Sequence, residues 1–287
     1  MISLVKLGTV DYATGQRLQQ QLVTLRKEEK IGDVLLLLEH SPVITLGRNA
    51  KSANVIASPE LLAQRGVEQV ECDRGGDVTF HGPGQIVGYP IFDLRGFARG
   101  AADAPSALRK SLGAVEFVRR LEEVLIRTCA DFAISTERIQ GLTGVWTTPA
   151  HGAADAPVRP TAHRTDEGVR PSTSPEAKLA AIGVHISRFV TSHGFALNVN
   201  TDLTYFNLII PCGITSKPVT SMQQELGRPL DLNAVAESIS RNFGTVFSSQ
   251  ILWVDTLDAL LGRTVGVPMK PPAELRQLYK EDGTTWA

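Results

Sequence analysis

Residues 182–200 show the pattern that most restricts the fold of this chain: apolar side chains at every second position over two adjoining segments. The apolar positions are Ile182, Val184, Ile186, Phe195, Leu197 and Val199. A period of two is typical of half-buried strands. Residues 191–194 between the two segments suit a turn, so we expect a β-hairpin here.

Other strand and helix patterns surround this hairpin in irregular order. Apolar runs indicate strands within residues 33–39 and 67–94, and helix-spaced apolar residues indicate helices within about 11–30, 105–132 and 232–247. Because strands and helices do not alternate regularly, we expect an α+β fold with mixed β-sheets and flanking helices rather than a Rossmann-type sheet.

Residues 147–176 differ in composition from the rest of the chain. They hold five of its 16 prolines and contain no Leu, Ile or Phe. Such a segment cannot bury enough apolar surface to offset its ordering entropy. We therefore expect residues 1–287 to form a single domain that carries 147–176 as a Pro-rich surface insertion.

Charge and cysteine content exclude several classes of protein. The 287 residues contain 29 basic and 30 acidic side chains, which argues against a dedicated nucleic-acid binder. No apolar run approaches the ~18 residues of a membrane span, and the N-terminus does not resemble a signal peptide. Three cysteines without a CxxC spacing exclude a disulfide framework and a zinc knuckle. We expect a soluble cytoplasmic protein without a metal.

Residues 74–90 are rich in glycine and contain a short stretch of period two. Gly75 and Gly76 allow the backbone to approach a ligand closely or to adopt positive φ. From position 77, Val78 and Phe80 would face a core, and Asp77, Thr79 and His81 would face a cavity. A Gly-rich hairpin inside a sheet explains the same pattern equally well. Residues 74–90 are not a phosphate-binding P-loop, because no Gly-Lys-Ser/Thr follows the glycines.

Cys212 and Lys178 are candidates for reactive side chains. Cys212 lies between a proline and a glycine, where a turn can expose its sulfur, and Lys178 begins an apolar strand. A lone cysteine is more often a small buried residue, as we expect for Cys72 and Cys129, and a lysine at a strand edge is usually solvated. An ammonium near a thiol would favour the reactive thiolate.

In combination these motifs resemble the signature of the lipoyl(octanoyl) transferase family. The matching positions are Arg74-Gly75-Gly76, Thr79-Phe80-His81, Gly84-Gln85, Tyr89, Lys178, Ala181-Ile182-Gly183, His193 to Asn200, Asn207 and Pro211-Cys212-Gly213. The similarity covers roughly residues 30–145 and 176–250. Three motifs in the same order are far more specific than any one of them, and the insertion before Lys178 is the clearest departure.

The resemblance implies a fold like that of the biotin and lipoate protein ligase catalytic domains, and an acyltransferase that needs no cofactor. The family moves an octanoyl (or lipoyl) group from acyl carrier protein to a lysine of lipoyl-dependent enzymes, such as E2 subunits and the glycine-cleavage H protein. It implies an acyl-thioester on Cys212 with Lys178 as partner. The implied substrate-binding residues are Arg74, Gly75, Gly76, Asp77, Val78, Thr79, Phe80, His81, Ala181, Ile182, Gly183, Gly194, Phe195 and Ala196.

Several points stay open at the level of sequence. The alternatives are an ATP-dependent lipoate- or biotin-protein ligase, an octanoyl amidotransferase and a non-catalytic acyl-binding module. The oxyanion of the reaction could be bound by backbone N–H groups near Gly76 or Gly213, or by His81. An acidic carrier requires a local basic patch, for which the candidates are Arg48, Lys51, Arg74 and Arg138.

Overall fold

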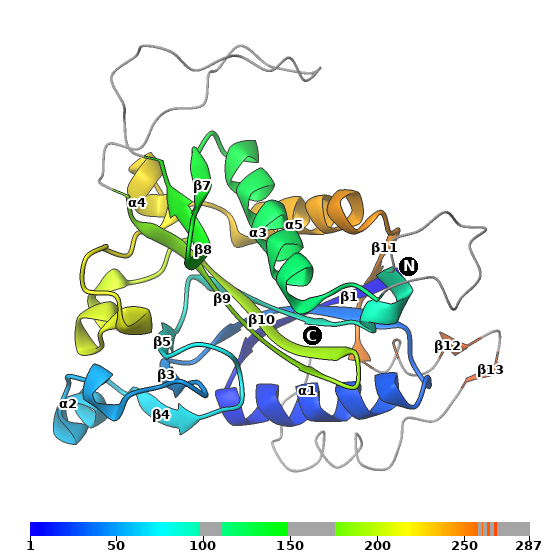
Figure 1. Ribbon diagram of the computed structural model, residues 1–287, viewed down its shortest axis with the longest axis horizontal. Helices are drawn as coiled ribbons and strands as arrows, with labels where there is room; N and C mark the ends of the chain where they lie inside the picture. Colours follow the sequence, from blue (N-terminus) through cyan, green and yellow to red (C-terminus); the bar gives the residue numbers. More distant parts are fainter. Residues whose placement is uncertain (98–110, 149–175, 258–259, 261–262, 265–266, 269–287) are drawn as a thin grey trace.

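The computed structural model describes residues 1–97, 111–148, 176–257, 260, 263–264 and 267–268. They form an α+β fold with an eight-stranded mixed sheet in the order β11-β1-β2-β6-β10-β9-β8-β7 and a three-stranded sheet in the order β4-β3-β5 (Figure 1). The strands are β1 (Ile2–Val10), β2 (Asp33–His40), β3 (Val43–Leu46), β4 (Glu68–Glu71), β5 (Val78–His81), β6 (Gln85–Ile91), β7 (Thr136–Ile139), β8 (Leu142–Thr147), β9 (Lys178–Ser187), β10 (Val190–Asn198) and β11 (Ile251–Val254).

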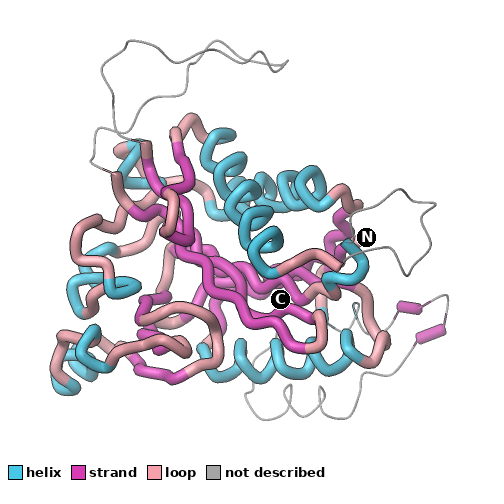
Figure 2. Tube along the Cα trace, in the orientation of Figure 1, coloured by secondary structure: helices cyan, strands magenta, loops and turns pink. Residues whose placement is uncertain are grey.

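Helices cover both faces of the large sheet (Figure 2). The helices are α1 (Tyr12–Lys27), α2 (Pro59–Gln64), α3 (Ala114–Asp131), α4 (Met222–Leu226) and α5 (Leu232–Phe247), with 3-10 turns η1 (Ser52–Asn54), η2 (Leu94–Phe97), η4 (Leu203–Leu208) and η5 (Pro211–Gly213). A separate two-stranded pair is β12 (Arg263–Thr264) and β13 (Val267–Pro268). Among the described residues, no helix is both long enough and apolar enough to cross a membrane.

The five consecutive apolar residues of β2 reflect burial on both faces of the sheet. Leu35 and Leu37 pack in the cluster beneath α3 and α5, whereas Leu36 and Leu38 pack in the cluster beneath α1. Because successive side chains of a strand point to opposite faces, a strand between two helical layers is apolar throughout. The strand and helices expected at 33–39, 11–30 and 232–247 are confirmed.

Two sequence-based boundaries differ from the structure. The helix expected over 105–132 is α3, which begins at Ala114 after Gly113 as N-cap; residues 98–110 lie outside the described part. The hairpin turn expected at 191–194 is wrong, because those residues belong to β10. The turn is Arg188–Phe189, whose φ angles are 50° and 67°. A two-residue hairpin turn of this kind usually contains Asn or Gly, and its sequence here carries no such signal.

The insertion expected at 147–176 falls almost wholly outside the described residues, which stop at 148 and resume at 176. Its two flanks lie together in the structure, since the Thr147 N–H donates to the Ala177 carbonyl at 2.9 Å. The single-domain organisation and the insertion remain predictions.

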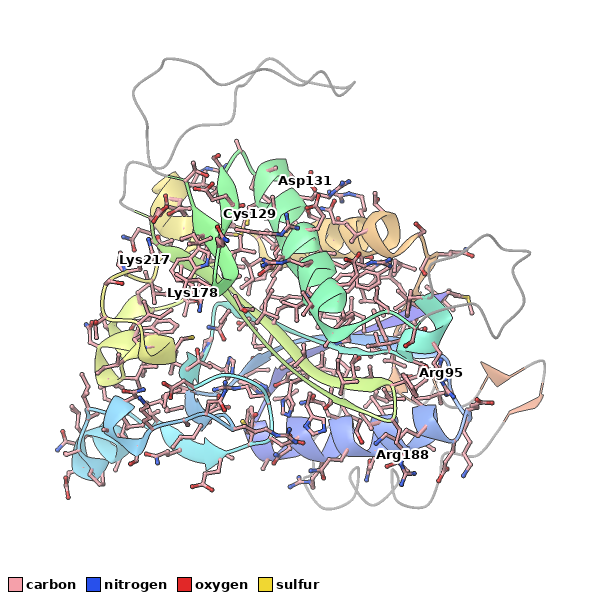
Figure 3. The ribbon with its side chains drawn as sticks, viewed as in Figure 1. Arg95, Cys129, Asp131, Lys178, Arg188 and Lys217 are labelled. Carbon is pink, nitrogen blue, oxygen red and sulfur yellow. The ribbon has the colours of Figure 1, made fainter. Side chains whose placement is uncertain are left out.

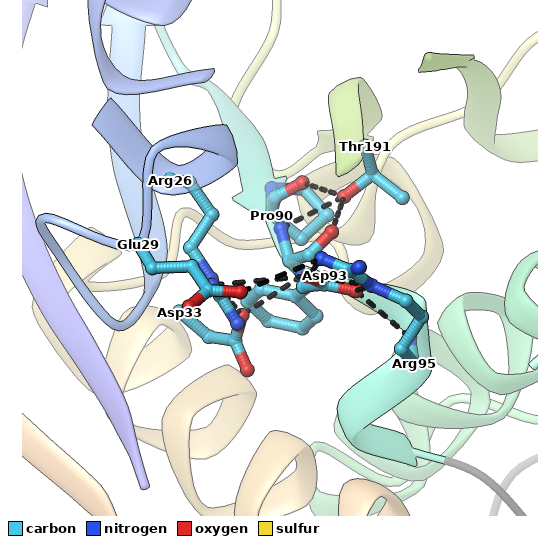
Figure 4. A network of polar contacts seen from close by, with 8 residues as sticks. Arg26, Glu29, Asp33, Pro90, Asp93, Arg95 and Thr191 are labelled. Carbon is cyan, nitrogen blue, oxygen red and sulfur yellow. Dashed lines mark hydrogen bonds and ion pairs between the residues drawn. The ribbon is translucent and has the colours of Figure 1, made fainter. Parts of the chain in front are cut away.

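A network of charged groups lies at the end of the large sheet next to the β9–β10 turn (Figure 4). It consists of Arg26, Asp33, Asp93 and Arg95, and we call it the far-end cluster. The Asp33 carboxylate accepts hydrogen bonds from Arg26 Nε at 2.8 Å and from the Asp93 N–H at 2.9 Å. Arg95 Nε donates to Asp93 Oδ1 at 2.9 Å. Burial alone would raise the pKa of Asp93, but the hydrogen bonds and the charge of Arg95 lower it below its usual value.

Candidate active site

Cys212 lies on a turn in which two consecutive residues have left-handed backbone conformations. The φ angle of Cys212 is 55° and that of Gly213 is 67°. Glycine adopts this conformation without steric cost, whereas cysteine does not. A Cβ atom at position 213 would lie 2.9 Å from Asp77 Oδ2, so only glycine fits there without displacement. The Ile210 N–H fixes the entry to the turn by donating to the Asn54 carbonyl at 2.7 Å.

Lys178 meets this turn although it lies 34 residues earlier in the sequence. Its Nζ donates to Cys212 Sγ at 3.1 Å. Lys178 is the first residue of β9, at the sheet end opposite Arg188 (Figure 3), and only 8% of its surface is exposed. Its N–H donates to the Pro218 carbonyl at 2.8 Å and its carbonyl accepts from the Thr220 N–H at 3.0 Å, so its backbone is fixed to the segment around Val219. The structure therefore brings together the two side chains expected to form the reactive pair.

The Trp146 ring lies against the ammonium of Lys178. The Lys178 Nζ lies 5.0 Å from the centre of the Trp146 ring, and Lys217 Nζ lies 6.0 Å from it. A cation over an indole face is attracted by the ring quadrupole. The stem of the lysine packs closely on β8, because a Cβ atom at Gly144 would lie 2.9 Å from Lys178 Cε. Lys217 is also paired with Glu176.

Cys212 opens onto a narrow cavity of about 50 Å³ on the α1 side of the large sheet. All the expected binding residues line this cavity except Val78 and Phe80. They come from three segments: strand β5 with the loop before it, strand β9 and strand β10. The lining residues also include Tyr12, Val87, Tyr89 and His193, which the sequence-based list of binding residues omitted.

Val78 and Phe80 lie on the opposite face of β5, in the apolar cluster of the small sheet. Both are essentially inaccessible, and the Phe80 ring stacks on Tyr205 with a centroid distance of 4.7 Å. The alternation of β5 explains this placement, because Thr79 and His81 point to the cavity and their neighbours point away. The expectation that Val78 and Phe80 contact the substrate is therefore not met by their position.

Asp77 and Arg74 line the cavity, but their charged groups are engaged with the protein. The Asp77 carboxylate accepts from the N–H groups of Val78 and Lys51, at 2.8 and 3.1 Å, and from Asn54 Nδ2. Arg74 NH2 donates to the Thr45 carbonyl at 2.6 Å. Both side chains thereby fix the loop before β5 and its glycines.

Two of the four expected basic-patch residues do not belong to an exposed patch. Arg74 is buried as just described, and Arg138 donates to Glu122 and Glu123 on α3. Arg48 and Lys51 are exposed, and their backbone N–H groups bond to cavity-lining residues. Sequence alone could not separate these cases, because buried and solvated arginines look alike in a composition.

Burial lowers the pKa values of two histidines near Tyr89, and one of them, His81, lines the cavity. His40 donates from Nδ1 to the Val10 carbonyl at 2.7 Å, so its Nε2 accepts the Tyr89 hydroxyl proton at 2.6 Å. Burial lowers the pKa of His40 to about 4. His81 bonds from Nδ1 to Gln85 Oε1 at 2.8 Å, and burial lowers its pKa to about 3. Tyr89 belongs to the motif that carried the family resemblance, which was the available signal for it.

His193 is the cavity residue with the least expected geometry. Its φ angle is 55°, and its Nε2 lies 2.7 Å from Asp73 Oδ1. Its backbone N–H donates to Gln19 Oε1 at 2.7 Å. Burial lowers the pKa of His193, and this effect outweighs the carboxylate of Asp73, which acts in the opposite direction.

The other groups considered from the sequence are the Gly213 N–H, Cys129 and Cys72, and the structure shows them engaged or buried. The Gly213 N–H donates to the Ile210 carbonyl at 3.1 Å, so this proposed oxyanion donor is already engaged. Cys129 is fully buried in α3, and burial raises the pKa of its thiol to about 12. Cys72 is half-buried and its Sγ lies 3.5 Å from the Leu46 carbonyl. Of the three free cysteines, Cys212 alone has a lysine as its partner.

Comparison with known proteins agrees with this geometry. Residues 11–244 match the lipoyl protein ligase A/B catalytic domain. The chain is 56% identical to an octanoyltransferase of Koribacter versatilis, with 98% of each chain covered, and 52% identical to one of Acidobacterium capsulatum, with 91% of this chain and 96% of that one covered.

Among solved structures, a bipartite lipoate protein ligase of Thermoplasma acidophilum superposes with a TM-score of 0.62 at 12% identity. The superposition covers 97% of this chain and 92% of that one, and it confirms the expected lipoate-ligase-like fold. The chain therefore belongs to the lipoyl protein ligase A/B catalytic-domain family and, within it, to the octanoyltransferases, which are acyltransferases.

Proposed function

We propose that this protein transfers an octanoyl group from acyl carrier protein to a lysine of lipoyl domains, through an acyl-thioester on Cys212. The observation that carries the proposal is the 3.1 Å contact between Lys178 Nζ and Cys212 Sγ, since Cys212 lines the cavity. A thiolate beside an ammonium is an activated nucleophile. The octanoyltransferase relatives at 56% and 52% identity support the same acyl group.

In the first half-reaction the Cys212 thiolate attacks the carbonyl carbon of the octanoyl thioester on the carrier. The tetrahedral intermediate collapses with cleavage of the bond to the carrier sulfur, which leaves as a thiol with a proton from Lys178. One thioester is exchanged for another, so the free-energy change is small and no ATP is needed. The Gly76 N–H, which has no partner among the described residues, is our candidate donor to the oxyanion.

In the second half-reaction the neutral amine of the acceptor lysine attacks the Cys212 thioester. The proton from this amine passes to Lys178, the Cys212 thiolate departs, and an amide bond replaces the thioester. Formation of an amide makes this step downhill. Lys178 is thus a proton donor in the first half-reaction and a proton acceptor in the second.

The acyl chain would lie against Ala181 and Gly183 of β9 and their partners Ala196 and Gly194 of β10, which are small residues on one face of the sheet. Burial of about six methylenes contributes on the order of 5 kcal/mol. The cavity of about 50 Å³ is smaller than the ~150 Å³ that holds a benzene molecule in a protein core, so the chain must part the cavity walls.

The donor and acceptor partners are part of the proposal. The donor is acyl carrier protein, and the acceptors are the lipoyl domains of E2 subunits and the glycine-cleavage H protein. Arg48 and Lys51 are our candidates for contact with an acidic carrier, because both are exposed and their backbone N–H groups bond to cavity-lining residues. A cytoplasmic location is supported by the three free thiols, which persist in reducing compartments.

The test is intact-mass spectrometry after incubation with octanoyl-acyl carrier protein. We expect one octanoyl adduct on the wild-type protein and none on Cys212→Ser, whose fold is verified by thermal melting. A natively folded wild-type protein without an adduct would contradict the proposal and support a non-catalytic acyl-binding module.

Two further measurements separate the enzymatic alternatives. Transfer by Cys212→Ala with free lipoate and ATP would indicate an adenylate-forming ligase. Adducts that form from an octanoylated H protein and not from octanoyl-acyl carrier protein would indicate an amidotransferase. Rapid adduct formation from the carrier protein, lost in Cys212→Ala, supports the transferase.

A further inference from the structure

The cavity follows the β9–β10 hairpin away from the reactive pair. Cys212 and Ala181 line the cavity, and so does His193, which lies opposite Val184 on the paired strand. Ala181 and Val184 are three residue steps apart, which corresponds to about 10 Å of strand. The small pairs Ala181–Ala196 and Gly183–Gly194 lie along this stretch. A chain attached to Cys212 and lying on these residues would therefore point at the His193 imidazole.

A second hollow of about 300 Å³ continues in the same direction beyond His193. Helix α1 covers it with Gln19, Val23 and Lys27, and the hairpin closes it with His185 and Ser192. His193 lines both this hollow and the acyl cavity. The side chain of His193 thus stands between two spaces that share one sheet face.

The backbone of His193 accounts for this placement. Its strand partner Val184 packs with the cluster beneath α3 and α5, and simple alternation would send the imidazole to that face as well. The left-handed φ of 55° turns the side chain to the α1 face, where its ring lies edge-on to Tyr89 with centroids 6.4 Å apart. Non-glycine residues held at a strained backbone position of this kind cluster at functional sites.

His193 is also rigidly held. Asp73 bonds its Nε2 at 2.7 Å, Gln19 accepts its backbone N–H at 2.7 Å, and only 4% of the residue is exposed. The lateral walls of the cavity can part to admit a chain, but this end is fastened to both α1 and the loop before β5. It is therefore a fixed limit on length.

We propose that His193 is the end wall of the acyl cavity and sets the upper limit on acyl-chain length. This inference rests on the proposed function, since it assumes an acyl chain on Cys212. Asp73 acts as a positioning residue for the imidazole. Removal of the imidazole would join the cavity to the second hollow, so that chains of about twelve carbons fit where eight-carbon chains now end.

The test uses His193→Gly, because glycine adopts a φ of 55° without strain. Rates of Cys212 adduct formation are compared by intact mass for octanoyl- and dodecanoyl-acyl carrier protein. We expect the dodecanoyl-to-octanoyl rate ratio to rise about tenfold or more over wild type, within the range that a few methylenes produce in a fitted pocket. The matched control is His185→Ala, which also removes an imidazole beside Asp73 but lines only the second hollow, and it should leave the ratio unchanged.

If His193→Gly does not fold, His193→Asn serves in its place, since asparagine tolerates left-handed φ and is shorter than histidine. An unchanged ratio in a folded variant that still forms the octanoyl adduct would overturn the inference and leave the proposed function standing. A wild-type protein that accepts both chains equally would overturn it as well. Failure of wild-type protein to form any adduct would instead refute the proposed function, and this inference with it.

Discussion

The two ends of the β9–β10 hairpin use charged groups in opposite ways. In the far-end cluster, Asp33 and Asp93 each accept from more than one donor, and they link α1, β2 and the segment after β6. At the other end, Lys178 contacts Cys212, which sits on a left-handed turn. The charged groups of the far-end cluster bind one another, whereas at the other end a thiol and an amine are in contact and can exchange protons. Substitutions at the two ends should therefore separate stability from reactivity.

The largest effect is expected for Gly213→Ala at the reactive end. An added Cβ would lie 2.9 Å from Asp77 Oδ2 and would strain a φ of 67°, so the turn must move and carry Cys212 with it. Octanoyl transfer should fall about a hundredfold, as small misplacements of reacting groups do. The matched control is Gly227→Ala, which has the same φ of 67° with open space around it. It should lose stability without loss of transfer; equal transfer losses in both variants would contradict the geometric argument.

Lys178→Ala tests the pairing itself. The alkylation of Cys212 by iodoacetamide at neutral pH should slow by about tenfold, because the thiolate loses its adjacent cation. Lys217→Ala provides the control, since Lys217 also lies on the Trp146 ring but has Glu176 as its ion-pair partner. An alkylation pH profile that does not move in Lys178→Ala would refute the pairing.

Asp93→Asn should have the smallest effect, and on stability alone. Loss of the charge on Asp93 weakens its bonds to Arg95, and we expect a destabilisation of about 1 kcal/mol with unchanged Cys212 alkylation. The lowered pKa of Asp93 gives a pH signature. Its contribution is complete above the usual carboxyl value of 3.8 and is lost as the pH falls through the lower folded-state value. Chemical denaturation between pH 6 and pH 2 should therefore show a smaller acid loss in the variant than in wild type.

The regular parts of the fold could be predicted from sequence because burial leaves a periodic signal. The apolar run of β2 and the amphipathic α5 are examples, and so is the period of two that placed Thr79 and His81 on the cavity side. The hairpin turn could not be located, because Arg188 and Phe189 adopt positive φ without the usual residues.

The site was predictable only in part. The proximity of Lys178 and Cys212 depends on a tertiary contact across 34 residues, for which the family resemblance was the sole sequence signal. The position of His193 depends on one left-handed residue inside a strand, which reverses the face that alternation assigns. Arg74 was expected at the surface, but its bonds to Thr45 became visible only with the fold.

The indole of Trp146 gives this enzyme a built-in optical probe. The ring is almost fully buried, and its centre lies 5.0 Å from the amine that is proposed to exchange protons with Cys212. Trp253, the other tryptophan in the described residues, is half-exposed on β11 at the opposite edge of the sheet. The fluorescence of a buried indole responds to a neighbouring charge. Acylation and deacylation of Cys212 should therefore change the Trp146 fluorescence, which can be followed in real time without a label. The spectroscopic change would then time each half-reaction in the unmodified protein.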